Sequence, residues 1–167
     1  MTPVSDQGVS KDRYSLIPRT LIFLTRGDSV LLLKGAPTKR LWANLYNGVG
    51  GHIEPGEDVL TSARRELGEE TGLEPDALWL CGVVIVETGQ NPGIGIYVLR
   101  GECNSGELLP SKEGALEWVP IKDLNRIQMV EDLPELLPHV LNMKPGDPPF
   151  SALYAYDANG KLHIRFG

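Results

Sequence analysis

The sequence predicts an α/β domain in which a mixed β-sheet lies between helices. Several short apolar runs bounded by turn signals are typical of strands. One segment has the three- and four-residue apolar spacing of a helical face, and a second, leucine-rich segment is also expected to be helical. With 167 residues, 41% of them hydrophobic, the chain is long enough for one well-cored domain and too short to suggest two. Strands mixed with two main helices favour a layered fold.

Two adjacent runs begin the predicted sheet. Residues 19–25 and 29–33 are apolar and are separated by a Gly-Asp turn sequence, so we expect two strands joined by a turn. The loop that follows carries the large aromatic Trp42 and the basic residues Lys39 and Arg40.

The central part of the chain supplies further strands and the second helix. Residues 79–87 and 95–100 are predicted strands, and residues 117–120 a short one. Residues 132–143 are expected to form a helix that is started or interrupted by its prolines.

The two ends of the chain differ in character. Residues 150–156 and 161–166 flank an Asn-Gly turn signal and are predicted to form a hairpin. Residues 1–14 are polar with mixed charge and are expected to be a flexible leader. The expected organisation is therefore a leader followed by a single domain over residues 15–167.

The first helix is the most informative element. Residues 58–71 place Leu60, Ala63 and Leu67 at the period of one helical face, which predicts a buried apolar stripe. Gly72 is a suitable stop because glycine adopts the left-handed conformation at little steric cost.

An acidic ridge is expected beside that stripe. At about 100° per residue, Ser62, Glu66, Glu69 and Glu70 fall together on a neighbouring face. Clustered carboxylates repel one another, and a hard divalent cation such as Mg²⁺ offsets that repulsion while keeping phosphate oxygens as further ligands. The alternative is a solvated acidic helix face, which is the usual role of a glutamate-rich helix.

The residues before the helix favour the metal-binding interpretation. The glycine-rich residues 48–51 allow close approach of the backbone to a ligand, and Pro55-Gly56-Glu57 is a tight-turn sequence. A glycine-rich loop that leads through a turn to a carboxylate-lined helix is suited to holding a diphosphate and a metal.

The whole segment resembles the signature of the Nudix hydrolases. From Gly51 to Leu73 the spacing is Gly, five residues, Glu, seven residues, then Arg-Glu-Leu-x-Glu-Glu-x-Gly-Leu, without a departure. The resemblance implies the Nudix fold, an α/β/α sandwich with a mixed sheet. It also implies metal-dependent cleavage of nucleoside diphosphates linked to another moiety, with Mg²⁺ or Mn²⁺ as cofactor.

The resemblance assigns roles to the residues of the segment. The metal ligands it implies are the Gly51 carbonyl and the carboxylates of Glu66, Glu69 and Glu70. Arg65 would orient Glu66, and Glu57 would brace the corner between loop and helix. An ordinary surface ion pair is the alternative for Arg65. Whether Glu66, Glu69 or a residue outside the segment takes the proton of the attacking water stays open.

Residues 45–51 also resemble the MutT-like enzymes that hydrolyse oxidised purine nucleoside triphosphates such as 8-oxo-dGTP. Their asparagine contacts the base, which makes Asn47, with Gly50 in the same loop, a candidate substrate contact; a simple Asn-Gly turn is the alternative. Glu113 stands five residues before a tryptophan, as in the animal enzymes of this group. It is a candidate metal ligand or base, or else a loop carboxylate.

The base-recognition segment of those animal enzymes is only partly matched. Asp132 retains its first acid, whereas Leu133 replaces the second and Val130 replaces an aromatic that stacks on the base. Losing a stacking surface removes about 1–3 kcal/mol of base binding, by analogy with stacking on nucleic-acid bases. Phe23, with Trp42 and Tyr154, could supply another wall, although such aromatics are more often core residues.

The leading hypothesis is a nucleoside triphosphate diphosphatase that releases a nucleoside monophosphate and pyrophosphate. Hydrolysis of ADP-ribose or a nucleotide sugar, and a non-catalytic nucleotide sensor, are the alternatives. The formal charge of −6 argues against nonspecific nucleic-acid binding. Without an apolar run of membrane-spanning length or a signal peptide, and with two cysteines, we expect a cytoplasmic protein with a small-molecule partner. A monomer and a homodimer both fit the sequence.

Overall fold

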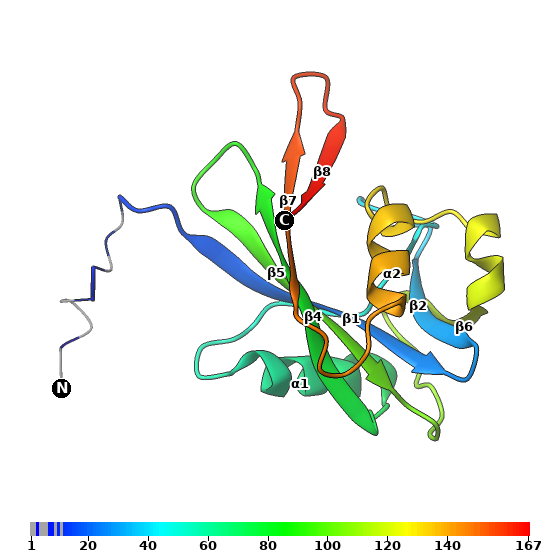
Figure 1. Ribbon diagram of the computed structural model, residues 1–167. Helices are drawn as coiled ribbons and strands as arrows, with labels where there is room; N and C mark the ends of the chain where they lie inside the picture. Colours follow the sequence, from blue (N-terminus) through cyan, green and yellow to red (C-terminus); the bar gives the residue numbers. More distant parts are fainter. Residues whose placement is uncertain (1–2, 4–6, 9, 11) are drawn as a thin grey trace.

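The computed structural model describes residue 3, residues 7–8, residue 10 and residues 12–167 (Figure 1). The remainder of the predicted 1–14 leader lies outside the described residues. The elements follow one another as β1 (Leu16–Arg26), β2 (Ser29–Gly35), β3 (Tyr46–Asn47), α1 (Val59–Thr71), β4 (Ala77–Glu87), β5 (Gly93–Glu102), β6 (Gly114–Pro120), the 3-10 helix η2 (Ile121–Arg126), α2 (Leu133–Leu141), β7 (Phe150–Tyr156) and β8 (Leu162–Phe166).

In the described part of the chain, eight strands form one mixed sheet. Its order is β3-β2-β1-β5-β4-β7-β8, and β6 pairs with β2 off this path. β1 runs parallel to β5 and β4 runs parallel to β7, whereas the other pairs are antiparallel. The predicted mixed sheet is confirmed.

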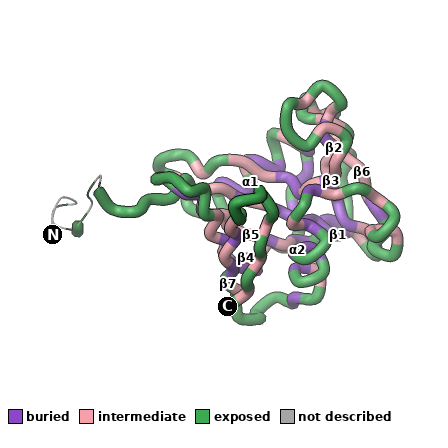
Figure 2. Tube along the Cα trace, turned by 90° about the horizontal axis from the view of Figure 1, so that it is seen from above, coloured by how far each residue is buried: buried purple, intermediate pink, exposed green. Residues whose placement is uncertain are grey.

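The helices α1 and α2 cover opposite faces of the sheet. Successive residues of β1 point to opposite faces. Ile22 and Leu24 pack in one buried cluster with Leu67 of α1, while Phe23 packs in a second cluster with Leu137 of α2. Figure 2 shows buried residues along the strands between the two helices. The expected α/β/α sandwich is therefore confirmed.

A gap in the pairing of β1 leaves room for the glycine-rich loop. β6 pairs along the whole of β2, but β1 pairs with β2 only next to their turn, and farther along β2 its partner is β3. Along the rest of β1, the N–H of Ile22 donates to the carbonyl of Val49 (2.7 Å) and the N–H of Thr20 donates to that of Gly51 (2.8 Å). Residues 48–51 therefore lie against the sheet, at the start of the path to α1.

The boundaries of α1 have clear local causes. The Asp58 carboxylate caps the first turn by accepting from the N–H groups of Leu60 (2.9 Å) and Thr61 (3.0 Å). Gly72 ends the helix with φ 73°, and its N–H donates to the carbonyl of Gly68 (3.1 Å).

The buried face of α1 differs from the predicted stripe. Ala63 and Leu67 are buried as expected, but Leu60 is 45% exposed. Leu60 lies in the first turn of α1. Its position around the helix axis matches that of Ala63 and Leu67, but no other element of the described chain covers its side chain. Ser62 and Glu66, which we expected on a separate acidic ridge, share the buried face instead. One carboxylate of the helix therefore points inward.

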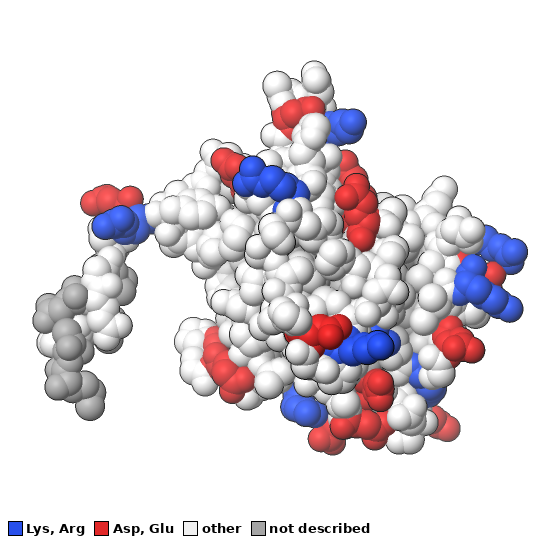
Figure 3. All heavy atoms as spheres, in the orientation of Figure 1, with Lys and Arg blue, Asp and Glu red and all other residues white. Residues whose placement is uncertain are grey.

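The other predicted elements are present, mostly longer than expected. β6 begins at Gly114 rather than at residue 117, and the second helix spans Leu133–Leu141 with Pro138 inside it. Among the described residues, no helix is long and apolar enough to cross a membrane. On the face shown in Figure 3, basic side chains are scattered among acidic ones.

Candidate active site

The glycine-rich loop brings backbone against a carboxylate of α1. A Cβ added at Gly51 would lie 2.6 Å from Cδ of Glu66, so a side chain here would displace the carboxylate. Gly48 is more tightly constrained, since a Cβ there would lie 2.8 Å from side-chain atoms of Leu21 and the buried Phe23 in β1. The glycines therefore let the loop lie flat between β1 and the helix, with Gly51 next to Glu66.

Arg65 holds the acidic residues of this corner in place. Its Nε donates to Oε1 of Glu57 (2.6 Å) and its Nη2 to Oε2 of the same carboxylate (2.9 Å). Its Nη1 donates to Glu66 (2.9 Å) and to Glu69 (3.3 Å). The Glu57 carboxylate also accepts from the N–H of Glu54 (3.0 Å).

The positive charge and the hydrogen bonds around Glu57 stabilise its ionised form. The hydrogen bonds from Arg65, followed by the one from the Glu54 N–H, lower the pKa of Glu57 to about 2. Arg65 thus contacts several carboxylates at once, and its hydrogen bonds to Glu57 join the loop to the helix.

A second carboxylate cluster forms around Glu70. Burial, followed by the charges of Glu66 and Glu113, raises the pKa of Glu70 to about 7, although Lys39 acts in the opposite direction. Glu113, which immediately precedes β6, forms an ion pair with Lys39. The corner thus concentrates negative charge that a cation would stabilise.

These donors suit a divalent metal, although they are not arranged as a finished cage. No group of three or more His, Cys, Asp or Glu among the described residues is positioned to hold a metal ion. Arg65 and Lys39 instead neutralise Glu66 and Glu113. Carboxylates plus the adjacent Gly51 backbone are nevertheless the oxygen-donor set that Mg²⁺ prefers. Binding of a cation by Glu113 would require Lys39 to release that carboxylate, whereas Glu66 can keep its hydrogen bond to Arg65 through Oε1 and still offer an oxygen to the metal.

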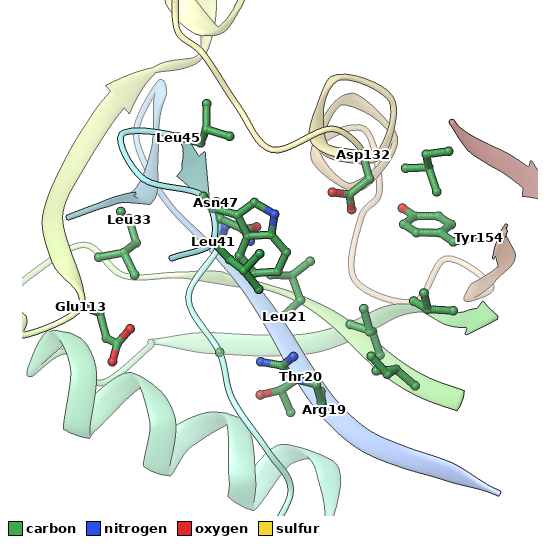
Figure 4. A pocket seen from close by; sticks show the side chains of 18 of the residues that line it. Arg19, Thr20, Leu21, Leu33, Leu41, Leu45, Asn47, Glu113, Asp132 and Tyr154 are labelled. Carbon is green, nitrogen blue, oxygen red and sulfur yellow. The ribbon is translucent and has the colours of Figure 1, made fainter. Parts of the chain in front are cut away.

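A cavity of about 540 Å³ opens beside this corner (Figure 4). Glu70 and Glu113 line one end, together with the basic side chains of Arg19 and Lys39. Its wall is largely apolar, and it is lined by Asn47, Gly48 and Gly50 of the glycine-rich loop and by Trp42. A volume of several hundred cubic ångströms fits a nucleotide-sized ligand.

The other end of the cavity carries polar groups from three separate elements. They are Asn47 of β3, Asp132 at the start of α2 and Tyr154 of β7. Oδ1 of Asn47 accepts from the N–H of Gly48 (2.7 Å), so the turn and the cavity-lining role of this residue coexist. Burial raises the pKa of Asp132.

Several predicted positions lie elsewhere. Phe23 is fully buried and packs in the core beneath Gly48, so it does not line the cavity. Val130 and Leu133 are 2% and 0% exposed and also belong to the core. The side chain of Glu69 is 62% exposed and contacts Arg65. Packing on β1 and under α2, which local sequence does not reveal, decides these positions.

The structure adds functional candidates that the sequence did not single out. Arg19 lines the cavity from β1, and its neighbours in sequence carry no motif. Lys39 belongs to a basic loop that was visible in the sequence, but its pairing with Glu113 depends on the fold. Tyr154 lines the opposite end of the cavity, where its hydroxyl is a candidate group in addition to the ring that the sequence indicates.

The fold and the site together define a hydrolase of phosphoric anhydrides, in which an acidic corner adjoins a nucleotide-sized cavity. The NUDIX domain family matches residues 16–140. This chain belongs to that family and is a Nudix hydrolase. Members of the family generally use divalent cations such as Mg²⁺ and act on small-molecule nucleotide substrates.

Named relatives agree with this assignment. The oxidized purine nucleoside triphosphate hydrolase of Danio rerio is 32% identical over 114 residues, which cover 68% of this chain and 72% of that protein. The Mus musculus protein of the same name is 30% identical over 111 residues, covering 63% and 70%. The crystal structure of a MutT protein from Bacillus halodurans superposes with a TM-score of 0.76 at 25% identity, covering 90% of this chain and 97% of that one.

Proposed function

We propose that this Nudix hydrolase is a nucleoside triphosphate pyrophosphohydrolase that acts on purine nucleotides, including oxidised ones such as 8-oxo-dGTP. It would add water across the phosphoanhydride and release a nucleoside monophosphate and pyrophosphate. The observation that carries the proposal is the cavity, because one end presents carboxylates and basic groups and the other presents polar groups suited to a base. The names of the fish and mouse relatives support the substrate class.

The metal in this proposal is Mg²⁺ or Mn²⁺. The Gly51 carbonyl and the carboxylates of Glu66, Glu69, Glu70 and Glu113 would hold it. When bound, such a cation supplies Lewis-acid stabilisation of the phosphate oxygens and lowers the pKa of a bound water.

The protein groups of the acidic corner divide the remaining work. Arg65 keeps Glu66 oriented through the 2.9 Å hydrogen bond and ties it to the Glu57 brace. Arg19 and Lys39 bring positive charge to the same end of the cavity, where the triphosphate would lie. A carboxylate of this corner would take the proton of the attacking water.

The base would occupy the opposite end. Since Oδ1 of Asn47 is engaged by the Gly48 N–H, its Nδ2 is the group that can donate to a base. Asp132 would accept an N–H of the base. Trp42, 51% exposed beside the cavity, offers a stacking surface where Val130 offers none.

A substrate panel in Mg²⁺ tests the proposal. It would compare 8-oxo-dGTP, the canonical dNTPs, ADP-ribose, dinucleoside polyphosphates and nucleotide sugars, with pyrophosphate and orthophosphate measured separately. We expect pyrophosphate release to be fastest with purine triphosphates. Preferential cleavage of ADP-ribose or a nucleotide sugar would replace the proposed substrate class, and tight nucleotide binding without turnover of any compound would indicate a sensor.

The proposed location is the cytoplasm. Both cysteines, Cys81 and Cys103, are free and buried, which suits a reducing compartment.

A further inference from the structure

One polar group at the base end of the cavity is incompletely hydrogen-bonded. Tyr154 is 4% exposed, and its hydroxyl oxygen forms no hydrogen bond of ordinary geometry with any described residue, although it interacts with the Asp132 carboxylate that it faces. Buried hydroxyl groups are normally hydrogen-bonded, so one at a cavity without a bond of ordinary geometry is a group that can bind a ligand. Figure 4 shows the Tyr154 oxygen turned toward the Asp132 carboxylate at the cavity wall.

The position of Tyr154 in the sheet fixes the direction of its side chain. Its Cα is paired with Val86 of β4 on one side and with Ile164 of β8 on the other. The ring therefore stands on the α2 face of the sheet, within the core cluster that includes Leu133 and Leu137. With the ring held on both sides, the hydroxyl is a rigid donor at the rim of the cavity.

The residues that follow Asp132 cannot replace this hydroxyl. Leu133 is fully buried in the core, and Val130 is 2% exposed, so neither reaches the cavity. Asp132 itself makes no capping hydrogen bond to α2, although it occupies the N-cap position. Its carboxylate is thus free to face the ligand rather than the helix.

We propose that the Tyr154 hydroxyl is a specificity-determining group that donates a hydrogen bond to an acceptor atom of the purine base, next to the base N–H that Asp132 accepts. This inference deepens the proposed function and rests on it for the nucleotide class. The edge of the base that faces these two residues therefore carries a donor, a ring N–H or amino group, for Asp132. Beside it lies an acceptor, a ring nitrogen or carbonyl oxygen, for Tyr154. Burial, followed by the charge of Asp132 and the hydrogen-bonding interaction with that carboxylate, raises the pKa of Tyr154, which keeps the hydroxyl protonated as a donor.

Tyr154→Phe tests the inference, because it removes only the oxygen. The matched control is Tyr97→Phe, which removes the hydroxyl of a tyrosine packed against the other core cluster, on the α1 side. Binding of purine monophosphates without metal should weaken about 10-fold in Tyr154→Phe and stay unchanged in Tyr97→Phe. In turnover, KM for purine triphosphates should rise about 10-fold while kcat is retained.

Base analogues identify the contact. Each analogue lacks one acceptor atom of the base, as a 7-deaza-purine monophosphate lacks N7. If the hydroxyl donates to that atom, the analogue should bind the wild type and Tyr154→Phe equally. The melting temperature of Tyr154→Phe should be unchanged or higher, because an unpaired buried hydroxyl is lost. A purely structural tyrosine would change stability without changing the preference among bases.

Two outcomes separate this inference from the proposed function. Unchanged purine affinity and KM in Tyr154→Phe would overturn the inference even if triphosphates are hydrolysed. Weakened monophosphate binding in Tyr154→Phe, with no triphosphate turned over, would support the inference while the proposed reaction fails.

Discussion

The two ends of the cavity are built in different ways. Most of the acidic end comes from one continuous stretch, residues 51–70, with Glu113 added from the residue before β6. The base end takes Asn47 from β3, Asp132 from the start of α2 and Tyr154 from β7, which are far apart in the chain.

This difference separates chemistry from specificity. The spacing of a turn and a helix can encode the acidic end, because neighbouring residues place its groups. At the base end, the register of β4 with β7 and the packing of α2 decide which side chains face the ligand. We therefore expect variants at the acidic end to affect all nucleotides alike, and variants at the base end to change the ranking of nucleotides.

The largest effect is expected for Glu70→Gln. Loss of this carboxylate should reduce kcat by about 10³-fold for every substrate, since metal-assisted charge stabilisation is worth several kcal/mol. Pyrophosphate release measures the loss, and circular dichroism should show an intact fold. Glu74→Gln, at an exposed position just beyond α1, is the control and should keep full activity. Wild-type turnover of Glu70→Gln would remove Glu70 from the site.

Arg65→Ala should have the next largest effect. It removes the group that orients Glu66 and joins it to Glu57, so kcat should fall about 10- to 100-fold with an unchanged order of substrates. The neighbouring exposed Arg64→Ala serves as the control. If both variants behaved alike, Arg65 would be no more than a surface ion-pair residue.

Asp132→Asn should act on specificity rather than on rate. KM for purine triphosphates should rise about 10-fold with kcat retained, because a charged acceptor is replaced by an amide. Titrating the substrates individually shows whether the ranking of bases changes. An equal loss for all nucleotides would contradict the division between the two ends.

The same variant should be more stable at neutral pH. Burial raises the pKa of Asp132 in the folded protein, so the folded state binds its proton more tightly than the unfolded state does. Its contribution to stability is therefore lost as pH rises from the unfolded pKa through the raised folded pKa. Thermal melts of Asp132→Asn should lack this decline and lie about 2 °C higher at pH 7. The same dependence of melting temperature on pH in both proteins would show that burial does not destabilise the ionised Asp132 carboxylate.

The smallest effect is expected for Trp42→Ala. The half-exposed indole should contribute the low end of stacking energies, about 1 kcal/mol, so KM for purine nucleotides should rise about 5-fold. Trp42 has φ 60°, an unfavourable conformation for a bulky residue, which is consistent with a functional position. Tyr14→Ala, an exposed aromatic that does not line the cavity, is the control.

Much of the fold was accessible from the sequence because its signals are local. The Gly-Asp and Asn-Gly turns, the caps of α1 and the apolar runs each depend on nearby residues. Leu60 shows the limit of local signals. It lies on the expected side of α1, but its burial would require a contact from another element, and it is 45% exposed. The inward position of Glu66 likewise depends on how α1 lies against the glycine-rich loop.

The sequence by itself determined the family, the acidic corner and the class of bond that is cleaved, because these depend on the spacing of residues within a turn and a helix. Only the tertiary structure decided which side chains meet the base. In the folded protein, Phe23, Val130 and Leu133 are buried in the core, and Tyr154 lies beside Asp132. The physical reason is that such contacts are set by strand register and helix packing between distant segments, which local spacing does not record.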